Sequence, residues 1–96
     1  MDNIFEVKDK TGRIISLYKK EWNHIVWYHA DVANTIELIR ETIMDPLCIN
    51  PDLDNENVWT YHRRYKEKEE YLVVVVKYLN GKGFIITSFW SKNLKQ

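Results

Sequence analysis

The sequence lacks the features of disulfide-linked, disordered, secreted or membrane-spanning proteins, which leaves a small globular domain. Cys48 is the single cysteine, which rules out an intramolecular disulfide and fits a reducing compartment. Three glycines and two prolines are few for a disordered chain, and 14% of the residues are aromatic. Residues 1–20 contain no signal-peptide core, and the longest apolar run, 72–76, is far shorter than a membrane span. We therefore expect one domain over residues 1–96, in the cytoplasm and without a membrane partner.

The whole chain has no excess of charge of one sign, but each of its two halves does. The formal net charge is zero. Residues 1–58 hold 11 acidic and 6 basic residues, a net of −5, and residues 59–96 hold 3 acidic and 8 basic residues, a net of +5. This asymmetry predicts a basic face that could hold phosphate. The alternative is that the two halves interleave in space, so that their fields cancel.

The first half of the chain has the pattern of a strand hairpin followed by a helix. Strands are expected at 4–8 and 13–18, joined by a turn in which Gly12 can adopt a positive φ. Apolar residues then recur with helical spacing over residues 19–28.

A second helix and a run of strands follow. The helix is expected to begin at Asp31, whose carboxylate can cap it, and to end near Asp45, because Pro46 disfavours helical geometry in the residue before it. Further strands are expected at 47–50, 58–65, 70–79 and 84–91. The sequence therefore predicts an α+β fold in which an N-terminal hairpin and two helices pack on an antiparallel sheet that ends in a three-stranded meander.

Strand alternation also predicts which side chains share a face of the meander. The register assumes that Tyr65 pairs with Glu70 and that Asn80 pairs with Gly83. One face is then mostly apolar and is expected to carry the helices: Trp59, Tyr61, Arg63, Leu72, Val74, Val76, Tyr78, Ile85, Thr87 and Phe89. The other face is mixed: Thr60, His62, Arg64, Val73, Val75, Lys77, Ser88 and Trp90. A slip of one residue would exchange the two faces.

The mixed face has the residue types that RNA binding and cleavage require. Arg64 and Lys77 could hold phosphate, with Ser88 as a nearby hydroxyl. Trp90 could stack on a base, and His62 could exchange protons near neutral pH. The alternative is a solvated sheet face with ordinary surface ion pairs.

The sequence contains no motif for a metal ion or a cofactor, and we expect neither. Asp52, Asp54 and Glu56 superficially suggest a calcium loop. However, Asn57 occupies the position of the required glycine and Arg63 that of the bidentate acid, so the match fails.

Several segments together are similar to one family of proteins. Trp22-Asn23-His24-Ile25 followed by His29-Ala30-Asp31 is similar to a W-x-H-I … H-P-E helix pattern, with Ala30-Asp31 in place of Pro-Glu. Similarities to an aromatic-and-Arg strand, a V-V-V-K strand and a G-F-I-I-T-A-Y strand occur at 59–65, 72–77 and 83–90. In this order, across residues 13–92, the chain resembles the phage-associated barnase/EndoU/colicin/RelE-like nuclease family.

The resemblance implies RNA cleavage by attack of a 2′-hydroxyl on the adjacent phosphate, without a metal ion. His24 and Thr87 stand at the family's histidine and hydroxyl positions. Arg64 is our candidate for charge stabilisation, with Arg63 as its competitor and as a substrate-binding residue. The sheet pattern adds His62 as an acid–base candidate. The resemblance and the assumed register disagree over Thr87, which the register places on the apolar face.

Two functions are therefore open. The first is an RNase that acts as a toxin or in RNA processing, restrained by an antitoxin or another protein partner. The second is a catalytically inactive interaction module of the same fold, which the neutral net charge favours. We expect a protein partner in either case, because an uncovered sheet face that carries Trp90 would be adhesive.

Overall fold

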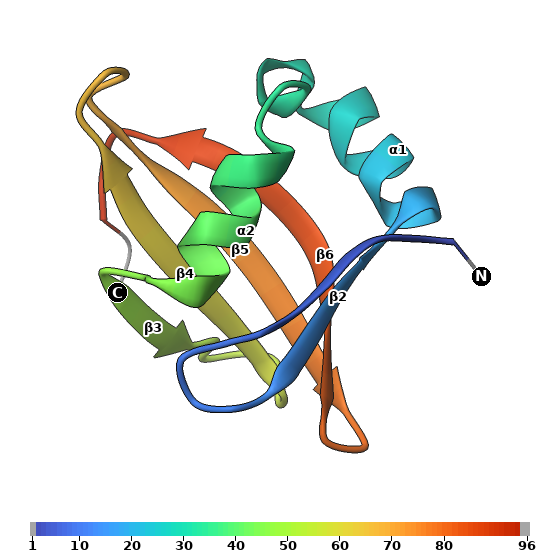
Figure 1. Cartoon of the computed structure of the whole chain (residues 1–96). Helices are drawn as coiled ribbons and strands as arrows, with labels where there is room; N and C mark the ends of the chain where they lie inside the picture. The colour runs from blue at the N-terminus through green and yellow to red at the C-terminus, as the bar shows by residue number, and fades with distance from the viewer. Residues whose placement is uncertain (1, 95–96) are drawn as a thin grey trace.

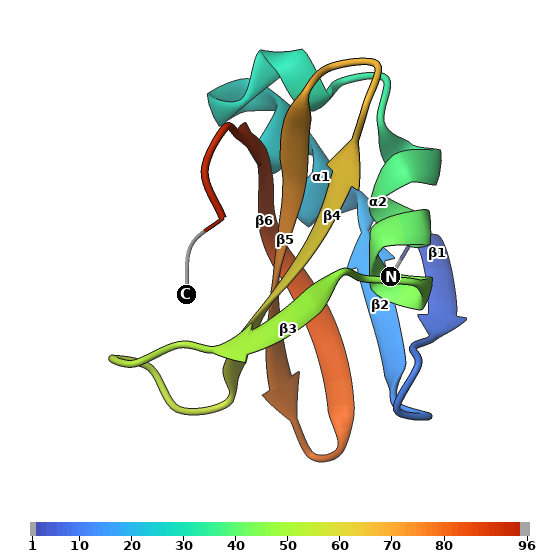
Figure 2. The ribbon, with the colours of Figure 1, turned by 90° about the vertical axis from the view of Figure 1, so that its left-hand side faces the viewer.

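The computed structural model describes residues 2–94, in which two helices lie on one side of a six-stranded sheet (Figures 1 and 2). The elements along the chain are β1 (Asn3–Lys8), β2 (Ile14–Tyr18), α1 (Lys19–Tyr28), the 3₁₀ turn η1 (Ala30–Val32), α2 (Ile36–Met44), β3 (Cys48–Pro51), β4 (Val58–Tyr65), β5 (Glu70–Leu79) and β6 (Lys82–Ser91). The predicted α+β class, N-terminal hairpin and C-terminal meander are confirmed. None of the helices within residues 2–94 is long and apolar enough to cross a membrane.

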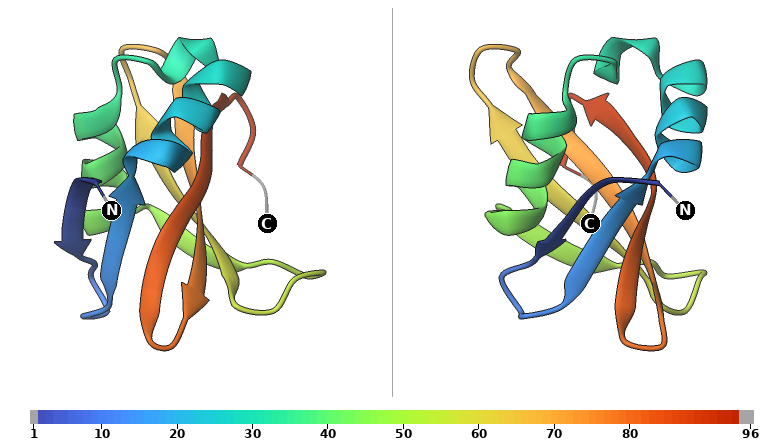
Figure 3. Two further views of the ribbon diagram at one scale, coloured as in Figure 1. Left: turned by 90° about the vertical axis from the view of Figure 1, so that its right-hand side faces the viewer. Right: turned by 45° about the vertical axis from the view of Figure 1, so that its right-hand side comes forward.

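The strand order in the sheet is β1-β2-β6-β5-β4-β3. The strands that pair are antiparallel except for β2 and β6, which run parallel, so the sheet is mixed. The sequence did not predict this parallel pair, because it joins two strands far apart in the chain. The β1–β2 hairpin thereby becomes one edge of the sheet, with β1 beside α2 (Figure 3).

The second helix begins later than the sequence predicted. Asp31 lies in η1 and does not cap a helix, whereas α2 starts at Ile36. The Thr35 hydroxyl donates a hydrogen bond of 2.6 Å to the carbonyl oxygen of Val32, which closes the turn before α2. The end of the helix is as expected, since Met44 is its last residue.

The core lies between the helices and the sheet. Ile25 of α1 and Ile39 and Ile43 of α2 are buried against the apolar side chains of the strands. The strand residues of this cluster are Val7, Ile15, Leu17, Tyr61, Leu72, Val74, Val76, Tyr78 and Ile85. Burial of this apolar surface supplies the main driving force for folding. The central position of β5 in the meander, expected from its four consecutive valines, is confirmed.

The β5–β6 turn is tighter than the turn that the assumed register implies. Leu79 pairs with Lys82, so that Asn80 and Gly81 alone form the loop, with φ angles of 54° and 81°. Positive φ at both loop positions matches the hairpin turn that Asn-Gly favours. The predicted pairing of Asn80 with Gly83 is therefore wrong, although the pairing of Tyr65 with Glu70 is confirmed.

A β-bulge in β6 changes which side chains of this strand face the helices. Val76 pairs with Ile85 but Val75 pairs with Thr87, so Ile86 is an extra residue without a partner in β5. Because side chains alternate along a strand, one extra residue reverses the face of every residue after it. The predicted faces of the following residues are therefore wrong: Thr87 and Phe89 share a face with His62, whereas Ser88 and Trp90 lie on the helix side.

Gly83 is required by its packing. A Cβ atom at this position would lie 2.9 Å from side-chain atoms of Ile15, Val76 and Tyr78, all of which are buried. We expect Gly83→Ala to lower the free energy of unfolding by about 1–3 kcal/mol, because the packed core must shift. Urea denaturation measures this loss. A loss of less than about 0.5 kcal/mol, as for an ordinary surface substitution, would contradict the packing argument.

Candidate functional site

The side of the sheet away from the helices, here called the open face, carries most of the predicted site residues (Figure 2). The register places on it Cys48 and Asn50 of β3, Thr60, His62 and Arg64 of β4, Tyr71, Val73, Val75 and Lys77 of β5, and Thr87 and Phe89 of β6. His62, Arg64 and Lys77 therefore lie on the predicted face. The open face combines an imidazole, the hydroxyls of Thr60, Tyr71 and Thr87, and two cations with apolar side chains.

His62 lies at the centre of the open face and is fully buried. Its cross-strand neighbours are Cys48 on β3 and Val73 on β5. The Nδ1 atom lies 3.7 Å from the Cys48 Sγ atom, and the Nε2 atom has no hydrogen-bond partner among the described residues. Burial lowers the pKa of His62, because desolvation disfavours the charged imidazolium. A neutral ring at pH 7 can accept a proton.

A pocket of about 420 Å³ opens beside His62. Its walls are Val73, Val75 and Phe89, with Thr60 and His62 as polar groups. The segment Asn50–Asp54 completes the lining on the side of the β3–β4 loop. This volume lies within the usual range for small-molecule sites, about 300–1,000 Å³.

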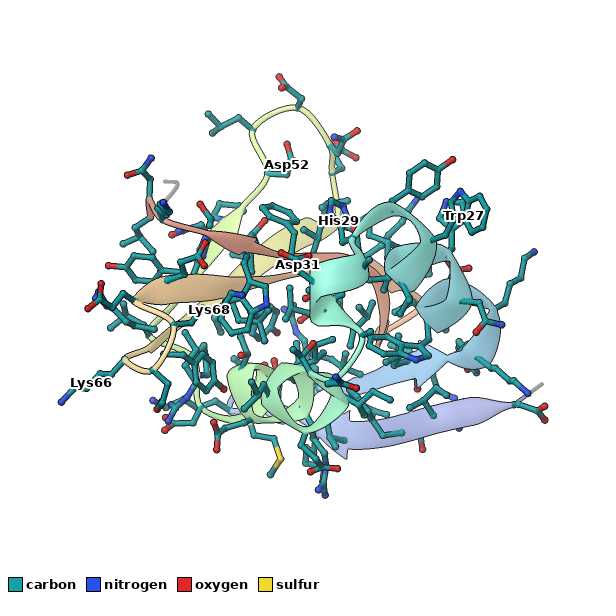
Figure 4. All side chains as sticks on the ribbon, turned by 90° about the horizontal axis from the view of Figure 1, so that it is seen from above. Trp27, His29, Asp31, Asp52, Lys66 and Lys68 are labelled. Atoms are coloured by element: carbon teal, nitrogen blue, oxygen red, sulfur yellow. The ribbon has the colours of Figure 1, made fainter. Side chains whose placement is uncertain are left out.

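The β3–β4 loop forms the rim of the pocket and carries negative charge. Figure 4 shows Asp52 in this loop, which projects from the side of the sheet opposite α2. The Asp52 carboxylate accepts hydrogen bonds from the backbone N–H of Asp54 and from the Asn55 amide. These bonds lower the pKa of Asp52, the Asp54 N–H most strongly. Asp54 itself is exposed, and within residues 2–94 its carboxylate has no hydrogen bond or ion pair.

The two adjacent arginines of β4 point to opposite sides of the sheet. Arg63 Nη1 donates hydrogen bonds to the backbone oxygen and the Oδ2 atom of Asp45, at 2.8 and 2.9 Å. Arg63 Nε also lies 3.4 Å from Glu41 Oε1. Arg63 is thus held against α2. Arg64 is exposed on the open face, with its guanidinium 5.7 Å from the centre of the Tyr71 ring. Arg64 is therefore the arginine that a phosphate on the open face can reach.

Ser88 and Trp90 take part in packing on the helix side. The Ser88 hydroxyl donates a hydrogen bond of 2.8 Å to the Val73 carbonyl oxygen, and the residue is fully buried. Trp90 packs against the core and edge-on against Tyr65, with the Lys68 ammonium 5.0 Å from its ring centre. The prediction that these two residues share a face with His62 is wrong, because the bulge reverses their orientation.

The histidines of α1 are placed differently from each other. His24 is exposed, and its ring lies 4.8 Å from the Tyr28 ring. No contact described within residues 2–94 joins His24 to the open face. His29, at the end of α1, has its ring 5.7 Å from that of Phe89. His29 is therefore the α1 histidine that contacts an open-face residue.

Sequence reasoning missed several members of the site. Asn50 fell at the end of a short predicted strand, and Phe89 was placed on the covered face. The alternation of Asn50 with Cys48, read together with the pairing of β3 with β4, would have placed Asn50 beside Thr60. No local signal revealed the bulge that turns Phe89 toward the pocket.

No group of three or more His, Cys, Asp or Glu side chains arranged to hold a metal ion is found among residues 2–94. Cys48 is half-buried beside His62 and is a free thiol.

The family model described as phage-Barnase-EndoU-ColicinE5/D-RelE like nuclease2 matches residues 3–96. No curated protein and no solved structure gives a match.

Proposed function

The chain belongs to the phage-Barnase-EndoU-ColicinE5/D-RelE like nuclease family, and from this membership we propose that it is an endoribonuclease that needs no metal ion. The observation that carries the proposal is the grouping of His62, Arg64 and Thr87 on the one face of the sheet that the helices leave uncovered. An imidazole, a guanidinium and a hydroxyl are the groups that attack of a 2′-hydroxyl on a phosphodiester requires.

In the proposed reaction, the 2′-oxygen forms a bond to phosphorus and the bond from phosphorus to the 5′-oxygen breaks. His62 takes the proton from the 2′-hydroxyl through Nε2, the nitrogen that has no partner among the described residues. Because the ring is fully buried, the attacking nucleotide must enter the pocket to bring its 2′-hydroxyl to this nitrogen. The products are a 2′,3′-cyclic phosphate and a 5′-hydroxyl.

The remaining roles follow from position. Arg64 stabilises the charge that develops on the phosphoryl oxygens, with Lys77 as a further cation on the same face. The Thr87 hydroxyl donates a hydrogen bond to a phosphoryl oxygen. The leaving 5′-oxygen needs a proton from a second acid, for which His24 and His29 are the candidates. Of the two, His29 is the better candidate for this acid, because its ring contacts Phe89 on the open face.

The proposal includes a cytoplasmic setting and a protein partner that restrains cleavage. Support for a partner comes from the end of α1, where Trp27 and Tyr28 are 82% and 66% exposed. Large exposed aromatic side chains that lie together are typical of interaction surfaces. The competing function is the inactive interaction module, which would use the same surface without cleaving RNA.

The test is incubation of the purified chain with total cellular RNA in excess EDTA, followed by analysis of the fragment ends. We expect discrete fragments with 2′,3′-cyclic phosphate and 5′-hydroxyl ends. Thr87→Val, purified in the same way, should cleave about tenfold or more slowly, because one donor to the phosphate is lost. Equal cleavage by both proteins would indicate a contaminating RNase. Intact RNA at high protein concentration would favour the interaction module.

A further inference from the structure

The pocket beside His62 has the wrong electrostatics for a phosphate. Its lining contains no lysine or arginine, and it contains two carboxylates, those of Asp52 and Asp54. A phosphate placed here would meet like charge without a compensating cation. The exposed Arg64 lies outside this lining, two residues beyond His62 on β4. The phosphate and the pocket occupant are therefore separate parts of the substrate.

The shape and polarity of the pocket suit a flat heterocycle. Val73, Val75 and Phe89 supply apolar walls, and Phe89 adds a ring that can stack. Polar groups come from Thr60 and from His62, which is fully buried and has an Nε2 atom without a partner among the described residues. The Nδ1 side of the His62 ring is turned to Cys48, which does not line the pocket. A buried polar atom without a partner is a position where a ligand gains a hydrogen bond. In the proposed reaction the 2′-hydroxyl of the bound nucleotide takes this position, which leaves Thr60 and Phe89 for its base.

The rim favours a ligand that donates hydrogen bonds. Both carboxylate oxygens of Asp52 already accept bonds from within the loop. The Asp54 carboxylate, in contrast, has no hydrogen bond or ion pair in the part of the chain that the structure describes. A carboxylate accepts hydrogen bonds and cannot donate them when ionised. Exocyclic amino groups of adenine, cytosine and guanine are donors. Uracil has no exocyclic donor, and its one edge N–H lies between two carbonyl oxygens that a carboxylate repels.

We propose that this pocket holds the base of the nucleotide whose 2′-hydroxyl attacks, and that Asp54 selects bases with an exocyclic amino group against uracil. The inference rests on the proposed function for its account of cleavage, but the binding of a base can be measured without catalysis. It predicts that cleavage products end in cyclic phosphates of adenosine, cytidine or guanosine and avoid uridine.

The first experiment is an NMR titration of the full chain with uncharged nucleosides and, separately, with inorganic phosphate. We expect cytidine to shift the His62 ring resonances and the backbone amides of residues 52–54 in a saturable way. Its affinity should exceed that of uridine by about tenfold, the effect of one charge-assisted hydrogen bond. Inorganic phosphate should leave the backbone amides of residues 52–54 unchanged and should not compete with cytidine.

Two variants of the loop make the test specific. Asp54→Asn removes the anionic acceptor and is expected to reduce the preference for cytidine over uridine by about tenfold. Glu56→Gln makes the matched change of charge in the same loop at a residue that does not line the pocket. It should leave the preference unchanged. An equal loss in both variants would show that the net charge of the loop, and not a contact at Asp54, sets the preference, and would overturn the assignment.

The failure of this inference can be told apart from failure of the proposed function. Selective binding of cytidine by a protein that does not cut RNA would support the base pocket and refute the RNase. Metal-independent cleavage without any bias against uridine, together with equal nucleoside affinities, would refute the base pocket and support the RNase activity. Saturable phosphate binding at residues 52–54 would also overturn it.

Discussion

Arg64→Ala is expected to lower the rate of RNA cleavage by about 10²- to 10³-fold while leaving the protein folded. The side chain is exposed on the open face, and its one described contact is with the Tyr71 ring, 5.7 Å away. Loss of such an exposed contact changes stability by about 1 kcal/mol or less. A cation that meets the phosphoryl oxygens acts mainly in the transition state, so kcat should fall more than the affinity for RNA. Single-turnover cleavage of a labelled oligonucleotide measures the loss.

The neighbouring arginine is the matched control for this prediction. Arg63→Ala removes the same charge one residue away, but from the side of the sheet that faces α2. It breaks the contacts with Asp45 and Glu41 and is expected to lower stability by about 1 kcal/mol, as for partly exposed ion pairs. Its cleavage rate under folding conditions should stay close to that of the wild type. If the two variants lose activity equally, general charge attraction explains the result and Arg64 has no specific role.

Asp9→Ala is expected to lower the free energy of unfolding by about 3 kcal/mol, the largest effect on stability that we predict. Asp9 is buried in the β1–β2 turn, where Oδ1 accepts hydrogen bonds from the backbone N–H groups of Thr11 and Arg13, both at 2.9 Å. Its Oδ2 accepts a bond of 2.5 Å from the Tyr61 hydroxyl, which is also hydrogen-bonded to Tyr78. Without the carboxylate, the buried Tyr61 hydroxyl, the Thr11 hydroxyl and two backbone donors lose their shared acceptor. Urea denaturation at pH 7 measures the change.

The pH dependence of stability tests whether the charge of Asp9 contributes to its stabilising effect. Burial alone would raise the pKa of Asp9, but hydrogen bonds from Tyr61, Thr11 and Arg13 together lower it. A lowered pKa in the folded state gives stability that is complete above the ordinary aspartate value, about pH 4, and is lost as the pH falls through the folded value. Asp9→Asn lacks this contribution, so its stability deficit should be constant from pH 5 to 7 and should shrink below about pH 4. A deficit that is independent of pH would contradict this account.

The helices, strands and most turns were predictable because their signals are local. The turn at Gly12, the end of α2 before Pro46 and the strands at 58–65 and 70–79 depend on neighbouring residues alone. The start of α2 was not predictable in this way. Asp31 is a good helix cap, but the hydroxyl of Thr35 closes a separate turn between Asp31 and the helix.

The candidate site was only partly predictable, for a different reason. His62, Arg64 and Lys77 were grouped correctly because β4 and β5 pair without interruption. Thr87, Ser88 and the other residues beyond Ile86 were assigned to the wrong faces from the register, because a bulge adds one residue to one strand only. The family resemblance favoured Thr87 as a site residue, and the bulge places it on the face of His62.

The sequence by itself determined the elements, their order, the apolar pattern that drives them together and the family to which the chain belongs. The tertiary structure decided the parallel pairing of β2 with β6, the bulge at Ile86 and the position of the β3–β4 loop at the rim of the pocket. The physical reason is that helix and strand periodicity is encoded in adjacent residues, whereas strand pairing and side-chain orientation depend on contacts between distant segments. For this reason the sequence could predict His62 as a candidate site residue, and only the fold revealed the pocket beside it.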